Sequence, residues 1–129
     1  MEAAAVSDKI RVLIADDHRL FAETLAALLA TEDRITVVGH AYDGKQAVRL
    51  ARELRPDVVL MDISMPVMDG FEATRRIRRQ NKKACVLMLT GSNSRADVDL
   101  ARKAGAAGYV TKDRIPAELI EAIVEVVER

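Results

Sequence analysis

Aromatic side chains are nearly absent from this chain, which has no tryptophan, two tyrosines and two phenylalanines among its 129 residues. Half of the residues are nevertheless hydrophobic, so the core has to be built from aliphatic side chains. The length suits one domain with a core of its own.

Cysteine is represented only by Cys85, which excludes an internal disulfide. A single thiol in an apolar run is typical of a buried side chain in a reducing compartment, and we expect a cytoplasmic location. Positive charge is not in excess either, since Lys plus Arg and Asp plus Glu number 20 each. This domain is therefore not expected to hold nucleic acid by neutralising its phosphates.

Long hydrophobic runs are also missing, and none approaches the length of a membrane span. The first residues lack the basic region and the apolar core of a secretory signal. We therefore expect a flexible lead-in at residues 1–9, a single domain at residues 10–129 and no membrane partner.

Short apolar runs alternate with stretches of helical periodicity along the chain. Strands are expected at residues 11–15, 35–41, 57–62, 84–89 and 108–111, and helices at residues 20–30, 44–55, 71–79, 94–104 and 116–127. Pro56 and Gly105 mark helix ends, and Pro116 suits a first helical turn. Five strand–helix pairs predict an α/β fold, a flavodoxin-like doubly wound parallel sheet with strand order 2-1-3-4-5 and five helices.

Acidic side chains follow two of the expected strands. Asp16 and Asp17 come directly after the first strand, and Asp62 ends the third. In the expected order these strands are neighbours, and their carboxyl ends lie at the switch point where such sheets bind ligands. Three like charges in one pocket repel one another unless a cation or a proton binds. Magnesium suits carboxylates that handle phosphate, so the cluster predicts metal-assisted phosphoryl chemistry.

Two further polar residues end strands at the same edge, Thr90 after the fourth strand and Lys112 after the fifth. Asp62 would attack phosphorus to give an acyl phosphate, Thr90 would donate to a phosphoryl oxygen, and Lys112 would neutralise another. Each residue alone also has a plain interpretation, as a helix cap or a solvated loop residue. A structural role, however, does not require all five residues to share one edge.

Together these residues resemble the receiver domain of two-component response regulators. The resemblance rests on Asp16-Asp17, on Asp62 within Met61-Asp-Ile-Ser-Met-Pro-Val-Met-Asp-Gly70, on Thr90 and on Lys112, and it covers roughly Ile10 to Val127. It implies that a sensor histidine kinase transfers a phosphoryl group to Asp62 in the presence of Mg²⁺. It also implies that Asp17, Asp62 and the backbone carbonyl of Ser64 bind the ion, that Asp16 assists through water, and that Thr90 and Tyr109 form a switch pair.

The start Asp16-Asp17-His18 resembles the NarL/FixJ-like subgroup, which carries a LuxR-type helix-turn-helix output. This resemblance implies transcriptional control through a DNA-binding domain that is not in this sequence. Two positions depart from the common pattern, because Asp113 replaces a frequent proline and Gly91 replaces the usual alanine. A cis bond before Asp113 would be costly without proline, and Gly91 is expected to admit water to the phosphoryl site.

A magnesium-dependent phosphatase of the haloacid-dehalogenase kind is a rival interpretation. Such enzymes need Asp-x-Asp after their first strand, and Asp62-Ile-Ser64 lacks the second carboxylate. A substrate cap also has little room in so short a chain. We expect a protein that catalyses its own phosphorylation and dephosphorylation at Asp62 without turnover of a separate substrate. The five site residues likewise disfavour an interaction module that has lost phosphorylation.

Other motifs give weaker signals. The segment from Gly39 to Lys45 has the spacing of a phosphate-binding loop, but Gln46 stands where Ser or Thr is needed and Gly39 falls in an expected strand. His18 is expected to be an exposed loop residue and His40 a strand end, neither of them a metal ligand.

The remaining expectations concern the switch and self-association. Tyr109 either packs inward or points outward, and the helix at residues 94–104 has only Val98, Ala101 and Ala104 as an inner face, so it is the element expected to shift. The last helix carries more apolar residues than one stripe needs, namely Leu119, Ile120, Ile123, Val124, Val126 and Val127. Core packing explains most of them, and a homodimer contact with the first helix is the alternative.

Overall fold

A single parallel sheet forms the centre of the computed structural model, which describes residues 9–91 and 94–128. The strands are β1 (Ile10–Ala15), β2 (Ile35–Ala41), β3 (Val58–Asp62), β4 (Cys85–Thr90) and β5 (Gly108–Thr111). Their order is β2-β1-β3-β4-β5, which confirms the expected topology. Each strand begins and ends within one residue of its expected bounds. The expected lead-in lies almost wholly outside the described residues, which begin at Lys9.

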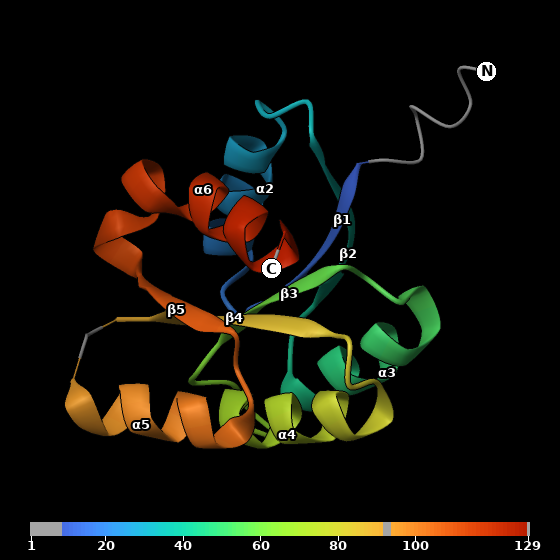
Figure 1. Ribbon diagram of the computed structural model, residues 1–129, viewed down its shortest axis with the longest axis vertical. Helices are drawn as coiled ribbons and strands as arrows, with labels where there is room; N and C mark the ends of the chain where they lie inside the picture. Colours follow the sequence, from blue (N-terminus) through green and yellow to red (C-terminus); the bar gives the residue numbers. More distant parts are fainter. Residues whose placement is uncertain (1–8, 92–93, 129) are drawn as a thin grey trace.

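Helices cover both faces of the sheet, so that the fold has three layers (Figure 1). One face carries α2 (Arg19–Leu29) and α6 (Ile115–Glu128), and the other carries α3 (Gly44–Leu54), α4 (Gly70–Gln80) and α5 (Arg95–Ala104). A 3-10 turn that the sequence did not predict, η1 (Lys112–Arg114), leads directly into α6. Among the helices of the described ranges, none is long and apolar enough to cross a membrane.

The core is aliphatic, as the composition predicted, and it is divided by the sheet. Successive side chains of a strand point to opposite faces. Val12, Ile14, Val58, Leu60, Leu87 and Leu89 pack with α2 and α6, whereas Leu13, Ala15, Val59, Met61, Val86 and Met88 pack on the other side. Because both faces are covered, the central strands are continuous apolar runs. Cys85 is half-buried and packs against the first of these clusters.

Side-chain caps and special backbone conformations set the helix ends. The carboxylates of Asp43 and Asp69 accept hydrogen bonds from the backbone N–H groups of Gln46 and Glu72, at 2.7 and 2.9 Å. At the other end of α3, Arg55 has a left-handed conformation (φ 48°) directly before Pro56. The structure thus confirms Asp69 as the cap of α4, and it ends α3 at Leu54, just before Pro56.

The loop from Ile63 to Asp69 lies tightly against the end of β3. A Cβ atom at Gly70 would overlap the backbone carbonyl of Asp62, and the N–H of Gly70 donates to the carbonyl of Ile63 at 2.8 Å. Within the loop, Val67 has a φ of 70°, an unusual conformation for a β-branched residue. The absence of a side chain at Gly70 therefore allows the loop to follow Asp62 closely.

Candidate functional site

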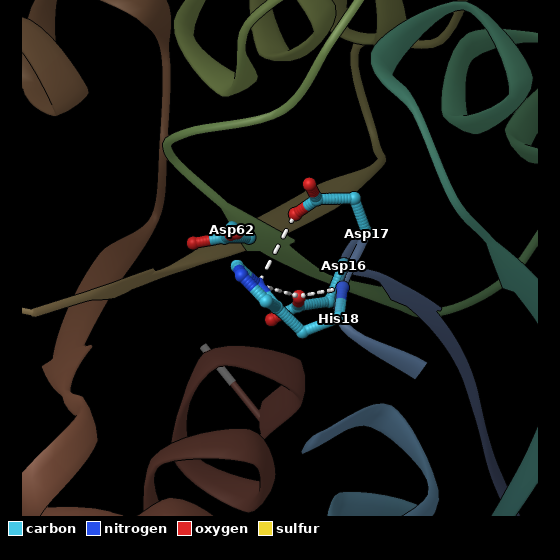
Figure 2. A group of neighbouring side chains, drawn as sticks. All are labelled: Asp16, Asp17, His18 and Asp62. Carbon is cyan, nitrogen blue, oxygen red and sulfur yellow. Dashed lines mark hydrogen bonds and ion pairs between the residues drawn. The ribbon is translucent and has the colours of Figure 1, made fainter. Parts of the chain in front are cut away.

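Three carboxylates meet at the carboxyl edge of the sheet. The neighbouring strands β1 and β3 pair in parallel with Ala15 opposite Met61, so the residues that follow, Asp16 and Asp62, leave the sheet at the same level. One ligand atom from each of Asp16, Asp17, His18 and Asp62 lies within 4.8 Å of the others (Figure 2). The structure thus brings together the three acidic residues that the strand ends predicted.

Two carboxylate oxygens in this cluster are buried without a hydrogen-bond partner among the described residues. Asp16 is fully buried and Asp62 is 5% exposed. Asp16 Oδ1 accepts the backbone N–H of His18 at 2.8 Å, but Asp16 Oδ2 and Asp17 Oδ1 accept no hydrogen bond from the described part of the chain. The ammonium Nζ of Lys112 lies 3.5 Å from Asp16 Oδ2, and the imidazole Nδ1 of His18 lies 3.3 Å from Asp17 Oδ1, but neither contact is a hydrogen bond. Buried carboxylates in this state favour a further cation.

Lys112 places its ammonium between two of the acids. Its Nζ lies 3.4 Å from Asp62 Oδ1 and 3.5 Å from Asp16 Oδ2. Burial raises the pKa of Asp62, the charge of Asp16 adds to this increase, and Lys112 opposes it. Since one ammonium faces three carboxylates within the described ranges, the site keeps an excess of negative charge. An acidic set of oxygen ligands of this kind fits Mg²⁺.

An aromatic ring supports Lys112 from the other side. The ring centroid of Phe21, in α2, lies 4.5 Å from Lys112 Nζ. Phe21 falls in the helix expected at residues 20–30, and the sequence gives no sign of this contact. The spacing that it shares with Leu25 marks a buried face only, and cannot identify which charged group a ring will meet.

The other expected site residues lie on β4, on β5 and in the loop after β3. Thr90 is buried at the end of β4, directly after Leu89, the register partner of Asp62. Ser64 is exposed in the loop after β3. Tyr109 is 42% exposed and lines a surface hollow with Arg95, Val98, Asp99 and Arg102. Of the two orientations considered for Tyr109, the structure therefore has the outward one.

The two departures from the family pattern have simple structural outcomes. The Lys112–Asp113 peptide bond is trans, as expected without proline. A Cβ atom at Gly91 would meet no described atom within 4 Å, so the described residues leave the space beside Thr90 open there. The phosphate-loop spacing also has no structural counterpart, because Gly39 lies inside β2.

The two histidines differ in their surroundings. His40 lies in β2 with its Nδ1 3.3 Å from the hydroxyl of Tyr42. His18 is exposed, as expected, with 69% of its side chain accessible, but its Nδ1 lies 3.3 Å from both Asp16 Oδ1 and Asp17 Oδ1. The only sequence signal for this contact was the position of His18 directly after the two aspartates.

Comparison with known proteins identifies one family by both sequence and structure. Residues 12–124 match the family described as "Response regulator receiver domain". The chain is 44% identical over 114 residues to transcriptional regulatory protein LiaR of Bacillus subtilis, covering 88% of this chain and 54% of LiaR. It is 43% identical over 114 residues to response regulator GacA of Pseudomonas viridiflava, covering 88% and 53%. The chain thus spans about half the length of these curated relatives.

Solved structures share the fold. A two-component response regulator of the LuxR family from Aurantimonas sp. SI85-9A1 superposes with a TM-score of 0.89 at 39% identity, covering 93% of this chain and 86% of that one. CheY in the CheX–CheY–BeF₃–Mg²⁺ complex from Borrelia burgdorferi has a TM-score of 0.84 at 27% identity, covering 91% and 88%. These likenesses agree with the strand order seen here.

Proposed function

The chain belongs to the response regulator receiver domain family, and from this premise we propose that Asp62 accepts a phosphoryl group in the presence of Mg²⁺. Receiver domains are phospho-accepting signalling domains of two-component systems and not substrate-turnover enzymes. The observation that carries the proposal is the convergence of Asp16, Asp17 and Asp62 with the ammonium of Lys112 at one sheet edge. The related CheY forms a complex that contains BeF₃ and Mg²⁺, which supports the choice of ion.

In the proposed transfer, an oxygen of Asp62 forms a bond to phosphorus while the bond between phosphorus and the kinase histidine breaks, and the electron pair leaves with the imidazole. Lys112 neutralises charge on a phosphoryl oxygen, and the hydroxyl of Thr90 donates to another. Mg²⁺ would be held by Asp17, Asp62 and the carbonyl of Ser64, with Asp16 assisting through water. When bound, it supplies positive charge to the phosphoryl oxygens.

The same event would switch the surface of α5, β5 and α6. A phosphoryl group adds charge and strong acceptor oxygens, which draw the Thr90 hydroxyl and leave space that Tyr109 can fill. The outward Tyr109 matches the state before switching in this proposal. Only Ala101 and Ala104 of α5 are buried, with Val98 half-buried, so this helix is weakly anchored and suited to move.

The proposed partners follow from the family. A sensor histidine kinase would supply the phosphoryl group, and an output domain outside this sequence would bind DNA, as the transcriptional regulators among the relatives suggest. The domain itself is proposed to occupy residues 10–129. A homodimer through α6 and α2 stays a prediction. Leu119, Ile123, Val124 and Val126 are in the core, and Val127 is the only large apolar residue of α6 that is exposed.

Acetyl phosphate with Mg²⁺, followed by intact mass measurement, tests the proposal. Wild type should gain one phosphoryl group, and Asp62→Asn should gain none. Asp57→Asn is the matched control, since Asp57 immediately precedes β3 at its opposite end and accepts the N–H of Arg11 at 2.8 Å. Labelling of Asp62→Asn, or steady turnover of a generic phosphate ester by wild type, would contradict the proposed role.

A further inference from the structure

His18 adds a nitrogen to a cluster whose other ligand atoms are all carboxylate oxygens. Its Nδ1 lies 3.3 Å from Asp16 Oδ1 and 3.3 Å from Asp17 Oδ1. Figure 2 shows the imidazole turned toward both carboxylates, with dashed lines from the ring to Asp16 and to Asp17. All four residues place one ligand atom within 4.8 Å of the rest, a spacing that a single ion can bridge.

Helix formation and packing do not explain this orientation of His18. The residue stands at the N-cap position of α2, but its side chain makes no capping hydrogen bond. With 69% of the side chain exposed, burial does not fix the ring either. The backbone N–H of His18 already holds Asp16 Oδ1 at 2.8 Å, and that bond is independent of the side chain.

A second observation points to a ligand at the same place. Asp16 Oδ2 and Asp17 Oδ1 are buried and have no hydrogen-bond partner in the described ranges, and Asp16 is fully buried. Buried polar atoms in this state are rare in native proteins and indicate an ion or water that completes them. Both oxygens belong to the residues that His18 contacts.

We propose that His18 is a fourth protein ligand of the metal site and extends it from Mg²⁺ to borderline divalent ions such as Co²⁺ and Zn²⁺. The inference rests on the proposed function, since the same aspartates hold both kinds of ion. Carboxylate oxygens suit Mg²⁺, whereas imidazole nitrogen suits transition metals and adds little for a hard ion. A mixed set of oxygen ligands and one nitrogen therefore raises the affinity for Co²⁺ relative to Mg²⁺.

The loss of Co²⁺ affinity in His18→Ala has a lower limit, which is set by the effect of residues that contact a metal ligand but not the metal itself. Removing a residue that only orients a metal ligand costs about 10- to 100-fold in affinity. Loss of a direct nitrogen ligand is therefore expected to lower the ratio of Co²⁺ affinity to Mg²⁺ affinity by at least about tenfold.

Calorimetric titration of the full chain with Co²⁺ and, separately, Mg²⁺ measures this ratio. His18→Ala should lower it at least about tenfold, while the backbone N–H of residue 18 still orients Asp16. His40→Ala is the matched control, because the other histidine of the chain lies in β2 beside Tyr42 and its loss should leave the ratio at the wild-type value.

Nitrogen NMR of the imidazoles with diamagnetic Zn²⁺ tests direct ligation. The Nδ1 resonance of His18 should move on titration while that of His40 stays in place. An unchanged affinity ratio in His18→Ala would overturn the proposal and leave the contact as a hydrogen bond of Nδ1 with Asp16 beside the carboxylate of Asp17. A lower ratio without movement of the His18 resonance would overturn it too, since the effect would be indirect.

Phosphoryl labelling separates this inference from the proposed function. If Asp62 is labelled with Mg²⁺ but His18 shows no role in Co²⁺ or Zn²⁺ binding, the proposed function stands and the ligand assignment fails. If neither Mg²⁺ nor Co²⁺ gives heat and Asp62 is not labelled, both fail.

Discussion

The ammonium of Lys112 lies over the face of Phe21, with 4.5 Å between Nζ and the ring centroid. On its other side the same atom contacts Asp16 and Asp62 at 3.5 and 3.4 Å. The ammonium is thus held between an aromatic ring of α2 and the acidic cluster. If a metal ion and a phosphoryl group neutralise or rearrange the carboxylates, the ring contact still keeps the ammonium at the site.

Phe21→Leu is therefore expected to slow phosphoryl labelling of Asp62. A cation–π contact is worth about 1 kcal/mol at a partly exposed site, which corresponds to roughly fivefold in rate if the ammonium acts in the transition state. The initial rate of labelling by acetyl phosphate, followed by intact mass, measures the change. Phe21→Trp should retain the wild-type rate because it keeps an aromatic face.

The contact also predicts that Phe21 acts only through Lys112. In a Lys112→Ala background, Phe21→Leu should have no further effect on the labelling rate. Phe71→Leu, which alters a ring packed against the other core cluster in α4, should leave the rate unchanged. Equal slowing by Phe21→Leu with and without Lys112 would show that the ring serves core packing alone.

Asp62→Asn is expected to stabilise the metal-free protein. Burial and the charge of Asp16 raise the pKa of Asp62, so the ionised carboxylate is less favourable in the folded state than in the unfolded chain. Replacing it with a neutral amide of the same shape should increase the free energy of unfolding at neutral pH, by about 0.5–2 kcal/mol as for other stabilising substitutions. Chemical denaturation in the presence of a chelator measures this difference.

The sign of the pH dependence follows from the same shift. A carboxyl group whose pKa is raised by folding binds its proton more tightly in the folded state, so stability is lost as the pH rises. The loss begins near the unfolded value, about 3.9 for aspartate, and is complete above the raised folded pKa of Asp62. The advantage of Asp62→Asn should grow across this window and then level off. A constant or shrinking advantage would contradict the raised pKa.

The sequence predicted the parts of this site that depend on strand ends. The order of the parallel strands fixes which carboxyl ends are neighbours, independently of side-chain conformation. The sequence could therefore place Asp16, Asp17 and Asp62 together. The contact of Phe21 with Lys112 could not be predicted, since it joins α2 to the 3-10 turn η1, which has no clear sequence signal. The direction of the His18 ring depends on χ angles in a loop, which neither periodicity nor spacing reports.

Gly70→Ala tests how closely the loop after β3 must follow Asp62. Alanine is favoured over glycine in helices by up to about 1 kcal/mol, but here its Cβ would overlap the backbone carbonyl of Asp62, which cannot rotate away. The clash should prevail and lower the free energy of unfolding by about 2 kcal/mol. Thermal or chemical denaturation measures the change, with Gly91→Ala as the control. A Gly70→Ala protein as stable as wild type would show that the loop yields freely.

Gly91→Ala should instead prolong the life of the phosphorylated state. A Cβ atom at this position meets no described atom within 4 Å, so the substitution should change stability by no more than about 0.5 kcal/mol. The added methyl group would occupy open space directly after Thr90 and hinder the approach of water to an acyl phosphate on Asp62. After removal of acetyl phosphate, the decay of the phosphorylated mass should be slower than in wild type by about twofold or more, since excluding water protects reactive intermediates. Gly91→Ser should decay faster than Gly91→Ala, because its hydroxyl can hold a water molecule at the site. Equal lifetimes of the phosphorylated state in wild type and both variants would show that residue 91 does not control the access of water to Asp62.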